Sequence, residues 1–163
     1  MKNFSKLVFT SLFVLAVAPA FSQFSLGADL AIPNGDWSTF YSTGFGISGR
    51  YEAPIASVDK LNWTASAGFL SFSVKSPYSG SSWTVIPLTG GVKYYFQEAN
   101  AGFYVAGDLG FYLGSGTGTS KTDFGFAPGV GYRVNTWDFT FRFNSNSDFS
   151  YIGLRAAYVF AKK

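Results

Sequence analysis

The sequence predicts an all-β protein, an eight-stranded antiparallel up-and-down transmembrane β-barrel. The first observation is that apolar and polar residues alternate with a period of two in eight successive stretches, as in strands with two unlike faces. The second is the length of these stretches, since a tilted membrane strand needs about 9–11 residues. The third is composition: aromatic residues make up 20% of the chain and charged residues only 13%, whereas soluble domains carry about 25% charged residues.

The first 22 residues have a separate explanation. Lys2 and Lys6 provide a basic segment, residues 7–18 are apolar, and small residues precede a cleavage site after Ser22. The apolar run is about 12 residues long, shorter than the ~20 that a membrane helix needs. We therefore expect a secretory signal peptide at residues 1–22.

The first two alternating stretches are residues 24–32 and 44–52, and each has one apolar face and one face of small or charged residues. A Pro-Asn-Gly-Asp sequence at residues 33–36 opens the loop between them. Ala53 and Pro54 begin the next connection.

The third stretch begins at Leu61 and keeps its apolar phase to Phe69. Beyond it, Leu70 and Phe72 carry apolar side chains in the opposite phase. A β-bulge at residues 69–71 would explain this shift, because it inserts one extra residue into a strand.

The fourth and fifth stretches are residues 83–96 and 102–113, joined by a short polar turn. A Ser-, Gly- and Pro-containing loop precedes the fourth stretch. Residues 114–121, rich in Gly, Ser and Thr, are expected to form a flexible loop after the fifth.

The sixth and seventh stretches, residues 124–134 and 137–144, form a predicted hairpin. If the turn contains only residues 135–136, Arg133 lies directly across from Asp138, where an ion pair can form.

The eighth stretch is residues 150–160. Pro87 and Pro128 lie inside the fourth and sixth stretches, and proline removes a ladder hydrogen bond, so we expect bulges or kinks there. Connections after odd-numbered stretches are predicted to be longer than those after even-numbered ones, which places both chain ends on the periplasmic side.

The charged residues inside the stretches all lie on the face of small residues. The interior of an eight-stranded barrel is just filled by side chains, and buried charges must pair. We expect a structural charge network in the lumen, centred on Asp138, with Arg133 as its main partner and Arg155 on its other side. The network contains Asp29, Arg50, Glu52, Lys93, Asp108, Arg133, Asp138, Arg142 and Arg155.

Aromatic residues concentrate on the apolar face at the stretch ends. Because amphipathic rings favour membrane interfaces, this pattern predicts an aromatic girdle next to the short turns. The girdle contains Tyr51, Trp63, Tyr94, Phe96, Phe103, Tyr132, Trp137, Tyr158 and Phe160, with Phe24 beside them. A looser set near the long loops contains Phe45, Phe69, Phe111, Phe124 and Phe143.

With strands, girdle and charges placed, residues 23–163 resemble the small outer-membrane β-barrel proteins, of which the OmpA transmembrane domain and the OmpX-like barrels are examples. Tyr158 and Phe160 match the terminal aromatic alternation of that class, although three further residues follow. The resemblance implies export to the outer membrane of a Gram-negative cell envelope, insertion by the barrel-assembly machinery, and contact with outer-membrane lipids.

No enzymatic role is predicted. Some barrels of the class that this chain resembles are enzymes, and those that act on lipid A or as proteases use a histidine. The chain has no histidine and no cysteine, so it cannot assemble those catalytic sites. Asp108 or Asp138 beside a serine is better explained as a paired lumen charge, and Asp29 and Glu52 are expected to pair with Arg50 rather than bind a cation. We expect no catalytic residue, no metal site and no cofactor.

Without the signal peptide the chain has ten basic and nine acidic residues, which gives no basis for binding nucleic acid. The expected role is structural or a surface interaction, in which loops meet a partner in the envelope or outside the cell. The candidate exposed contacts are Trp37, Phe40, Tyr41, Tyr78 and Trp83.

Two alternatives remain. One is a narrow porin-like channel for water, ions or small solutes, with room left by inward glycines such as Gly129 and Gly131. The other is a soluble lipocalin-like binding barrel with the apolar face inside, which the number of bulky aromatics would overfill.

Overall fold

A computed structural model describes residues 22–161 except 79, 81, 117 and 148. The predicted signal peptide lies outside the described residues, apart from residue 22 itself. No helix in the described part of the chain is long and apolar enough to cross a membrane.

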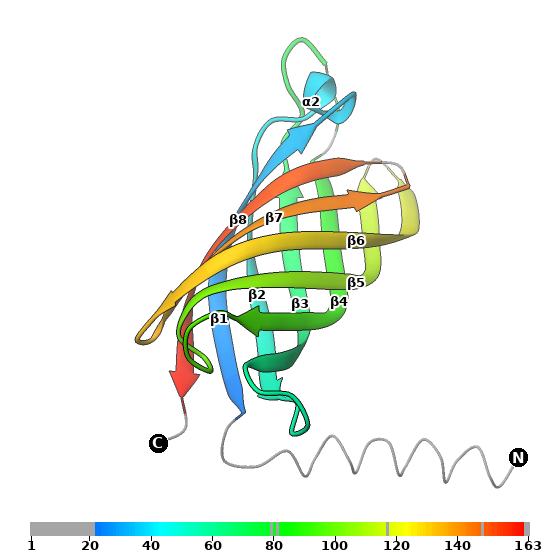
Figure 1. Ribbon diagram of the computed structural model, residues 1–163. Helices are drawn as coiled ribbons and strands as arrows, with labels where there is room; N and C mark the ends of the chain where they lie inside the picture. Colours follow the sequence, from blue (N-terminus) through cyan, green and yellow to red (C-terminus); the bar gives the residue numbers. More distant parts are fainter. Residues whose placement is uncertain (1–21, 79, 81, 117, 148, 162–163) are drawn as a thin grey trace, which may run out of the picture.

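Eight antiparallel strands form a closed barrel in which each strand pairs with its neighbour in sequence and β8 pairs with β1 (Figure 1). This confirms the predicted fold class. The strands and the one short helix are β1 (Gln23–Asn34), α2 (Trp37–Phe40), β2 (Gly44–Pro54), β3 (Leu61–Phe72), β4 (Trp83–Tyr95), β5 (Gly102–Gly116), β6 (Thr119–Val134), β7 (Trp137–Asn146) and β8 (Ser150–Ala161).

The two ends of the barrel differ. β1 begins and β8 ends at the same end of the barrel, at the bottom of Figure 1. At the opposite end, α2 and the β3–β4 connection project together beyond the strands. We call residues 35–43 and the described part of residues 73–82 the head.

The predicted β-bulge in β3 is wrong. The pairing of β3 with β2 and with β4 keeps one register from end to end. Leu70 and Phe72 point into the barrel and are buried, so the apparent change of phase marks a change in what fills the lumen.

The prediction of bulges at Pro87 and Pro128 is also wrong. The pairing of β4 with β3 is interrupted beside Pro87, and that of β6 with β7 beside Pro128, yet the register is the same on both sides of each interruption. A proline lacks the N–H that one ladder bond needs, but the flanking bonds are enough to hold the register.

The predicted alternation of connection lengths holds only in part. The β1–β2 and β3–β4 connections are long. By contrast, pairing extends to Gly116 and Thr119 in the β5–β6 hairpin and to Ser145 and Ser150 in the β7–β8 hairpin. The predicted flexible loop at residues 114–121 is therefore mostly paired strand.

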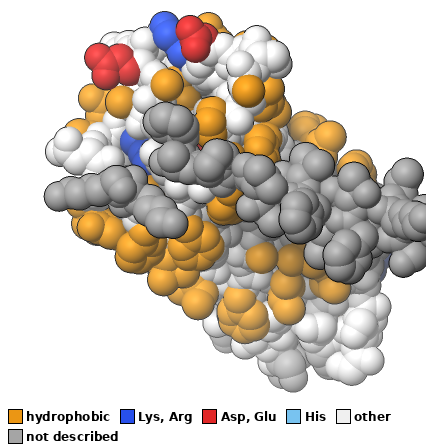
Figure 2. Space-filling model, turned by 90° about the horizontal axis from the view of Figure 1, so that it is seen from below, with side chains coloured by type: hydrophobic (Ala, Val, Ile, Leu, Met, Phe, Trp, Pro, Cys, Tyr) orange, Lys and Arg blue, Asp and Glu red, His pale blue; other side chains and the backbone are white. Residues whose placement is uncertain are grey.

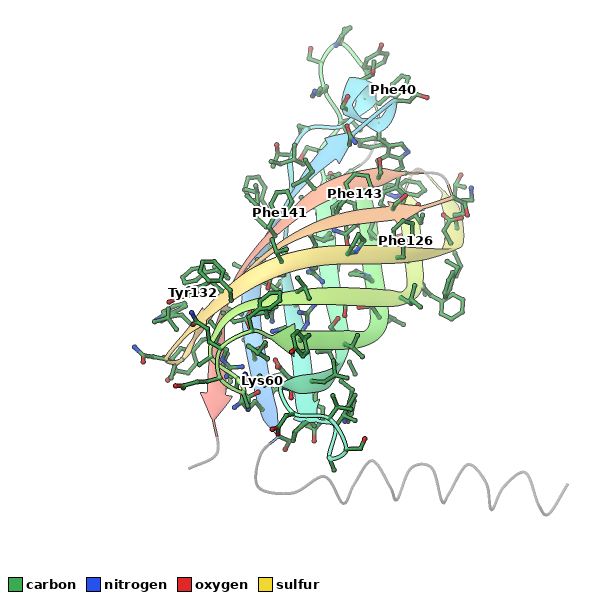
Figure 3. The ribbon with its side chains drawn as sticks, viewed as in Figure 1. Phe40, Lys60, Phe126, Tyr132, Phe141 and Phe143 are labelled. Atoms are coloured by element: carbon green, nitrogen blue, oxygen red, sulfur yellow. The ribbon has the colours of Figure 1, made fainter. Side chains whose placement is uncertain are left out.

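Apolar side chains cover the outside of the barrel and polar ones fill it. Ile47, Phe103 and Leu109 are 62%, 60% and 57% exposed, while Arg50 is 1% exposed. Phe126, Phe141 and Phe143 lie on the outer wall (Figure 3), and hydrophobic side chains cover much of the flank seen from below (Figure 2). This arrangement excludes the lipocalin-like alternative, in which the apolar face would be inside.

Candidate functional site

Lys93 is the centre of the charge group nearest the chain termini. Its Nζ lies 2.6 Å from an Asp138 carboxylate oxygen and 3.1 Å from one of Glu52. The hydroxyls of Tyr104 and Tyr95 donate to Asp138 and Glu52, respectively, each at 2.8 Å. Each carboxylate therefore has a cation and a phenol as partners.

Arg133 does lie opposite Asp138 in the β6–β7 register, as predicted. Its ion pair, however, is with Glu52, at 3.7 Å from Nη1 to the carboxylate, so Arg133 is not the partner of Asp138. Lys93 reaches Asp138 from across the lumen instead. Arg155 lies on the other side of Asp138, with Nη1 4.0 Å from its carboxylate.

A second charge group lies closer to the head. Arg50 pairs with Asp108 at 2.9 Å, and Arg142 lies 3.3 Å from Asp29 and 3.6 Å from Asp108. The Ser48 hydroxyl also donates to Asp29. The expected pairing of Asp29 and Glu52 with Arg50 is therefore wrong for both carboxylates.

All nine predicted network residues point into the barrel, and every strand except β3 contributes at least one. β3 contributes neutral polar groups: Asn62 donates to Glu52, and Thr64 donates to Asp108. The pairs form across the lumen, so the lumen at this level is filled by ion pairs.

The two inward glycines expected to leave room face large side chains. A Cβ at Gly131 would meet the Tyr104 ring, and one at Gly129 would lie 2.7 Å from Arg142 Cγ. The room that the sequence suggested for water is occupied by these neighbours.

Aromatic residues close the end of the lumen below the head. A buried cluster there is packed against Trp37, Tyr41 and Trp83; it contains Ala31, Leu70, Phe72, Val85, Tyr112, Phe149 and Tyr151. The Trp37 ring stacks on Tyr41 at 4.5 Å and on Phe149 at 4.6 Å between centroids. We call this cluster, with its three packed aromatics, the aromatic plug.

The sequence contains a signal for the plug. Leu70, Phe72, Val85, Tyr112 and Tyr151 are apolar or aromatic residues in the inward phase, each near the head end of its strand. Apolar residues on a polar-lumen face at one end of several strands indicate a hydrophobic cap.

The two loops of the head are joined to each other. The backbone N–H and the Nζ of Lys75 donate to the carbonyls of Phe40 and Ser38, at 2.8 Å and 2.7 Å. Tyr41 and Val74 form a β-bridge. These bonds make one unit of the two loops.

Of the five aromatics expected to be exposed, Trp37, Tyr41 and Trp83 are packed in the plug. Phe40 and Tyr78 are 45% and 48% exposed, and their ring centroids are 5.0 Å apart. Phe40 lies on the projecting head, at the opposite end of the barrel from Lys60 (Figure 3).

The predicted girdle residues all lie on the outer face, and many of their rings contact one another, across neighbouring strands or along one strand. Examples are Phe103–Tyr132 at 4.6 Å and Tyr51–Trp63 at 5.2 Å between ring centroids. Further contacts join Tyr94 to Phe96, Trp137 to Tyr158, Tyr158 to Phe160, and Phe24 to Phe160.

Solved structures with this architecture are small outer-membrane barrels. Ail, the attachment invasion locus protein of Yersinia pestis, is 16% identical, with a TM-score of 0.57 over 86% of this chain and 99% of that one. Neisserial surface protein A is 14% identical, with a TM-score of 0.59 over 86% and 97%. The N-terminal barrel of Pseudomonas aeruginosa OprF is 10% identical, with a TM-score of 0.55 over 85% and 97%.

The sequence itself matches no family model and no curated protein. At identities of 10–16% the structural matches establish the fold. The chain has the fold of a small outer-membrane β-barrel, and the outer wall of this barrel is covered by exposed apolar side chains. Within the described residues, no group of His, Cys, Asp and Glu side chains is arranged to hold a metal ion.

Proposed function

We propose that this protein is a non-enzymatic outer-membrane barrel that does not conduct and that presents its head to partners outside the cell. The observation that carries the proposal is the division of the head end into a sealed part and an exposed part. The aromatic plug closes the lumen, whereas Phe40 and Tyr78 remain exposed on a head held by its own hydrogen bonds.

Two structural neighbours support a surface role by their names. One is an attachment invasion locus protein, also solved in complex with the heparin analogue sucrose octasulfate, and another is a surface protein. The head of the present chain carries one acidic residue, Asp36, and one basic residue, Lys75. This charge balance favours a neutral or aromatic-binding partner over a sulfated polyanion.

The remaining partners follow from the fold. Outer-membrane lipids would surround the apolar wall, and the girdle aromatics would lie at the lipid interface. Insertion would require export by the predicted signal peptide at residues 1–22 and the barrel-assembly machinery. Ail, a structural neighbour, has been solved in a phospholipid bilayer nanodisc.

The narrow-channel alternative makes a separate prediction. A filled lumen closed by aromatic rings gives no reproducible conductance in planar bilayers, whereas a channel gives defined steps. A bulky residue at Gly129 or Gly131 is a poor blocking test, because each already contacts a large side chain. Defined conductance steps from the folded wild-type protein would overturn the closed-barrel proposal.

Orientation can be tested with single cysteines, since the native sequence has none. Thr39 lies in α2 of the head, and Ser57 lies in the β2–β3 connection at the other end. We expect a membrane-impermeant maleimide to label Thr39→Cys on intact cells and Ser57→Cys only after the envelope is permeabilised. The reverse pattern would contradict an outward-facing head.

The interaction role is tested by attachment of cells that display the protein. Replacing both Phe40 and Tyr78 with serine should lower attachment to the level of cells without the protein. Val58→Ser, at the opposite end and also exposed, is the matched control and should have no effect. Equal attachment by all variants would show that Phe40 and Tyr78 of the head do not mediate attachment.

A further inference from the structure

The charge group nearest the head contains one more positive than negative residue. Arg50, Arg142 and Arg155 provide three positive charges. Asp29 and Asp108 provide two negative charges, and both already accept hydrogen bonds or ion pairs. This group therefore has an excess of one positive charge.

The group nearer the termini is balanced. Lys93 and Arg133 face Glu52 and Asp138, two charges of each sign. The weak contact of Arg155 with Asp138, at 4.0 Å, does not add a carboxylate. Among the described residues, the lumen therefore holds one more positive than negative charge, and no further carboxylate balances it at either level.

The same region holds a small cavity whose lining includes Asp29 and four side chains with unsatisfied donors. Its volume is about 20 Å³, and Arg50, Arg142, Asn144 and Arg155 are among its lining residues. Five nitrogen atoms of these side chains have no hydrogen-bond acceptor among the described residues: Arg50 Nε and Nη1, Arg142 Nε, Asn144 Nδ2 and Arg155 Nη1. Arg50 is 1% exposed and Arg155 is 3% exposed, so bulk water does not satisfy them.

The cavity is closed toward the head by the aromatic plug, since Tyr112 and Tyr151 belong to both. Its size admits a single small occupant. A water molecule would accept some of the hydrogen bonds but would leave the positive charge buried and uncompensated, which is unfavourable. A monovalent anion provides both acceptor capacity and charge.

We propose that the lumen holds one small monovalent anion of the halide class, bound among Arg50, Arg142, Arg155 and Asn144. The anion is enclosed when the barrel folds and is a structural component of the closed lumen. This inference concerns the lumen and is independent of the surface role proposed for the head.

Asn144→Asp provides a direct test, because it places a carboxylate at the site with almost no change in shape. The Tyr112 hydroxyl donates to Asn144 Oδ1 at 3.3 Å, and an aspartate oxygen can accept the same bond. The protein is refolded from urea into detergent micelles in sodium chloride, sodium bromide or sodium gluconate of equal ionic strength, since gluconate is too large for the cavity.

For the wild-type protein we expect a higher Tm in chloride and bromide than in gluconate, with a saturable dependence on halide concentration. Asn144→Asp should have a Tm that does not depend on the anion and that in gluconate exceeds the wild-type value. Arg155→Gln should also lose the halide dependence. Arg133→Gln removes the same charge from the other group and should keep it.

Crystals grown in sodium bromide give a readout that does not depend on any variant folding. We expect an anomalous bromine peak between Arg50, Arg142 and Arg155. A bromide map with only water density there, or the same wild-type Tm in halide and gluconate, would overturn the proposal. So would a halide shift that persists in Asn144→Asp or disappears equally in Arg133→Gln.

Discussion

At the scale of single residues, the direction in which Lys93 points can be predicted from the sequence, but its ion-pair partners cannot. That Lys93 faces inward follows from its immediate neighbours, because successive strand residues point to opposite faces. Its partners, Glu52 and Asp138, lie on β2 and β7, across the lumen from β4. The sequence could therefore predict which charges enter the lumen but not which of them pair.

Lys93→Met should destabilise the folded barrel strongly. The change leaves Glu52 and Asp138 buried without their closest cation, and breaking a buried ion pair in this way costs about 3–5 kcal/mol. Urea unfolding of the protein in lipid vesicles, followed by tryptophan fluorescence, measures the change in the free energy of unfolding.

Lys121→Met is the matched control for this substitution. The Lys121 side chain is 47% exposed and lies 3.8 Å from Asp123, and surface pairs contribute about 0–1 kcal/mol. Equal effects of the two lysine substitutions would show that the lumen network does not stabilise the barrel.

At the scale of strands and loops, prediction failed where the pattern lacked apolar residues. Residues 114–121 continue the β5–β6 hairpin, but a run of Gly, Ser, Thr and Lys shows no apolar alternation and resembles a loop. Leu70 and Phe72 are apolar for a different reason. An apolar residue in this pattern predicts a position on the lipid face, whereas these two belong to the aromatic plug inside.

Gly131→Ala should destabilise β6, because the new Cβ would meet both the Tyr104 ring and the Phe139 carbonyl oxygen. Overpacking of this kind costs about 1–3 kcal/mol. Gly107→Ala is the control on the adjacent strand, since no atom lies within 4 Å of its Cβ position, and its effect should stay within about 0.5 kcal/mol. The same unfolding measurement in vesicles compares them, and a neutral Gly131→Ala would indicate a lumen with spare room.

Trp37→Ala should loosen the head without opening the barrel wall. Trp37 contacts Tyr41, Phe72, Trp83 and Phe149 through its ring, so its loss removes the main link between the head and the plug. We expect chymotrypsin to cleave within residues 35–43 at least about tenfold faster, which corresponds to about 1.4 kcal/mol of easier local opening. Phe40→Ala, on the exposed face of the same loop, should leave cleavage elsewhere in the head unchanged.

At the scale of the whole molecule, the barrel has its polar groups inside and its apolar groups outside. The sequence predicted this inversion because every outward position within the predicted stretches lacks a charge, while the inward positions of the same stretches carry nine. Barrel closure, by contrast, depends on the pairing of β1 with β8, which are far apart in the chain. The sequence implied closure only through the number and length of the strands.

Leu109→Arg tests whether the outer wall faces lipid. Leu109 is 57% exposed, and an exposed residue of a soluble barrel would tolerate arginine. In a bilayer, arginine on the lipid face near the midplane costs about 2–4 kcal/mol. Unfolding in vesicles measures this cost.

Val58→Arg provides the control, because Val58 is 45% exposed but lies in the β2–β3 connection beyond the barrel wall. Its effect should remain within about 0.5 kcal/mol. If Leu109→Arg were as mild as Val58→Arg, the wall would not be embedded in hydrocarbon.

The stack of Trp37 on Phe149 has a consequence for the order of events during folding. Trp37 follows the first strand and Phe149 precedes the last, so the two rings can meet at 4.6 Å only after the whole chain between them has been laid down. We therefore expect the head to reach its final form only when the segment that precedes β8 has joined the barrel. In a variant whose other tryptophans are replaced by phenylalanine, the fluorescence of Trp37 would report when its ring stacks on Phe149 during folding.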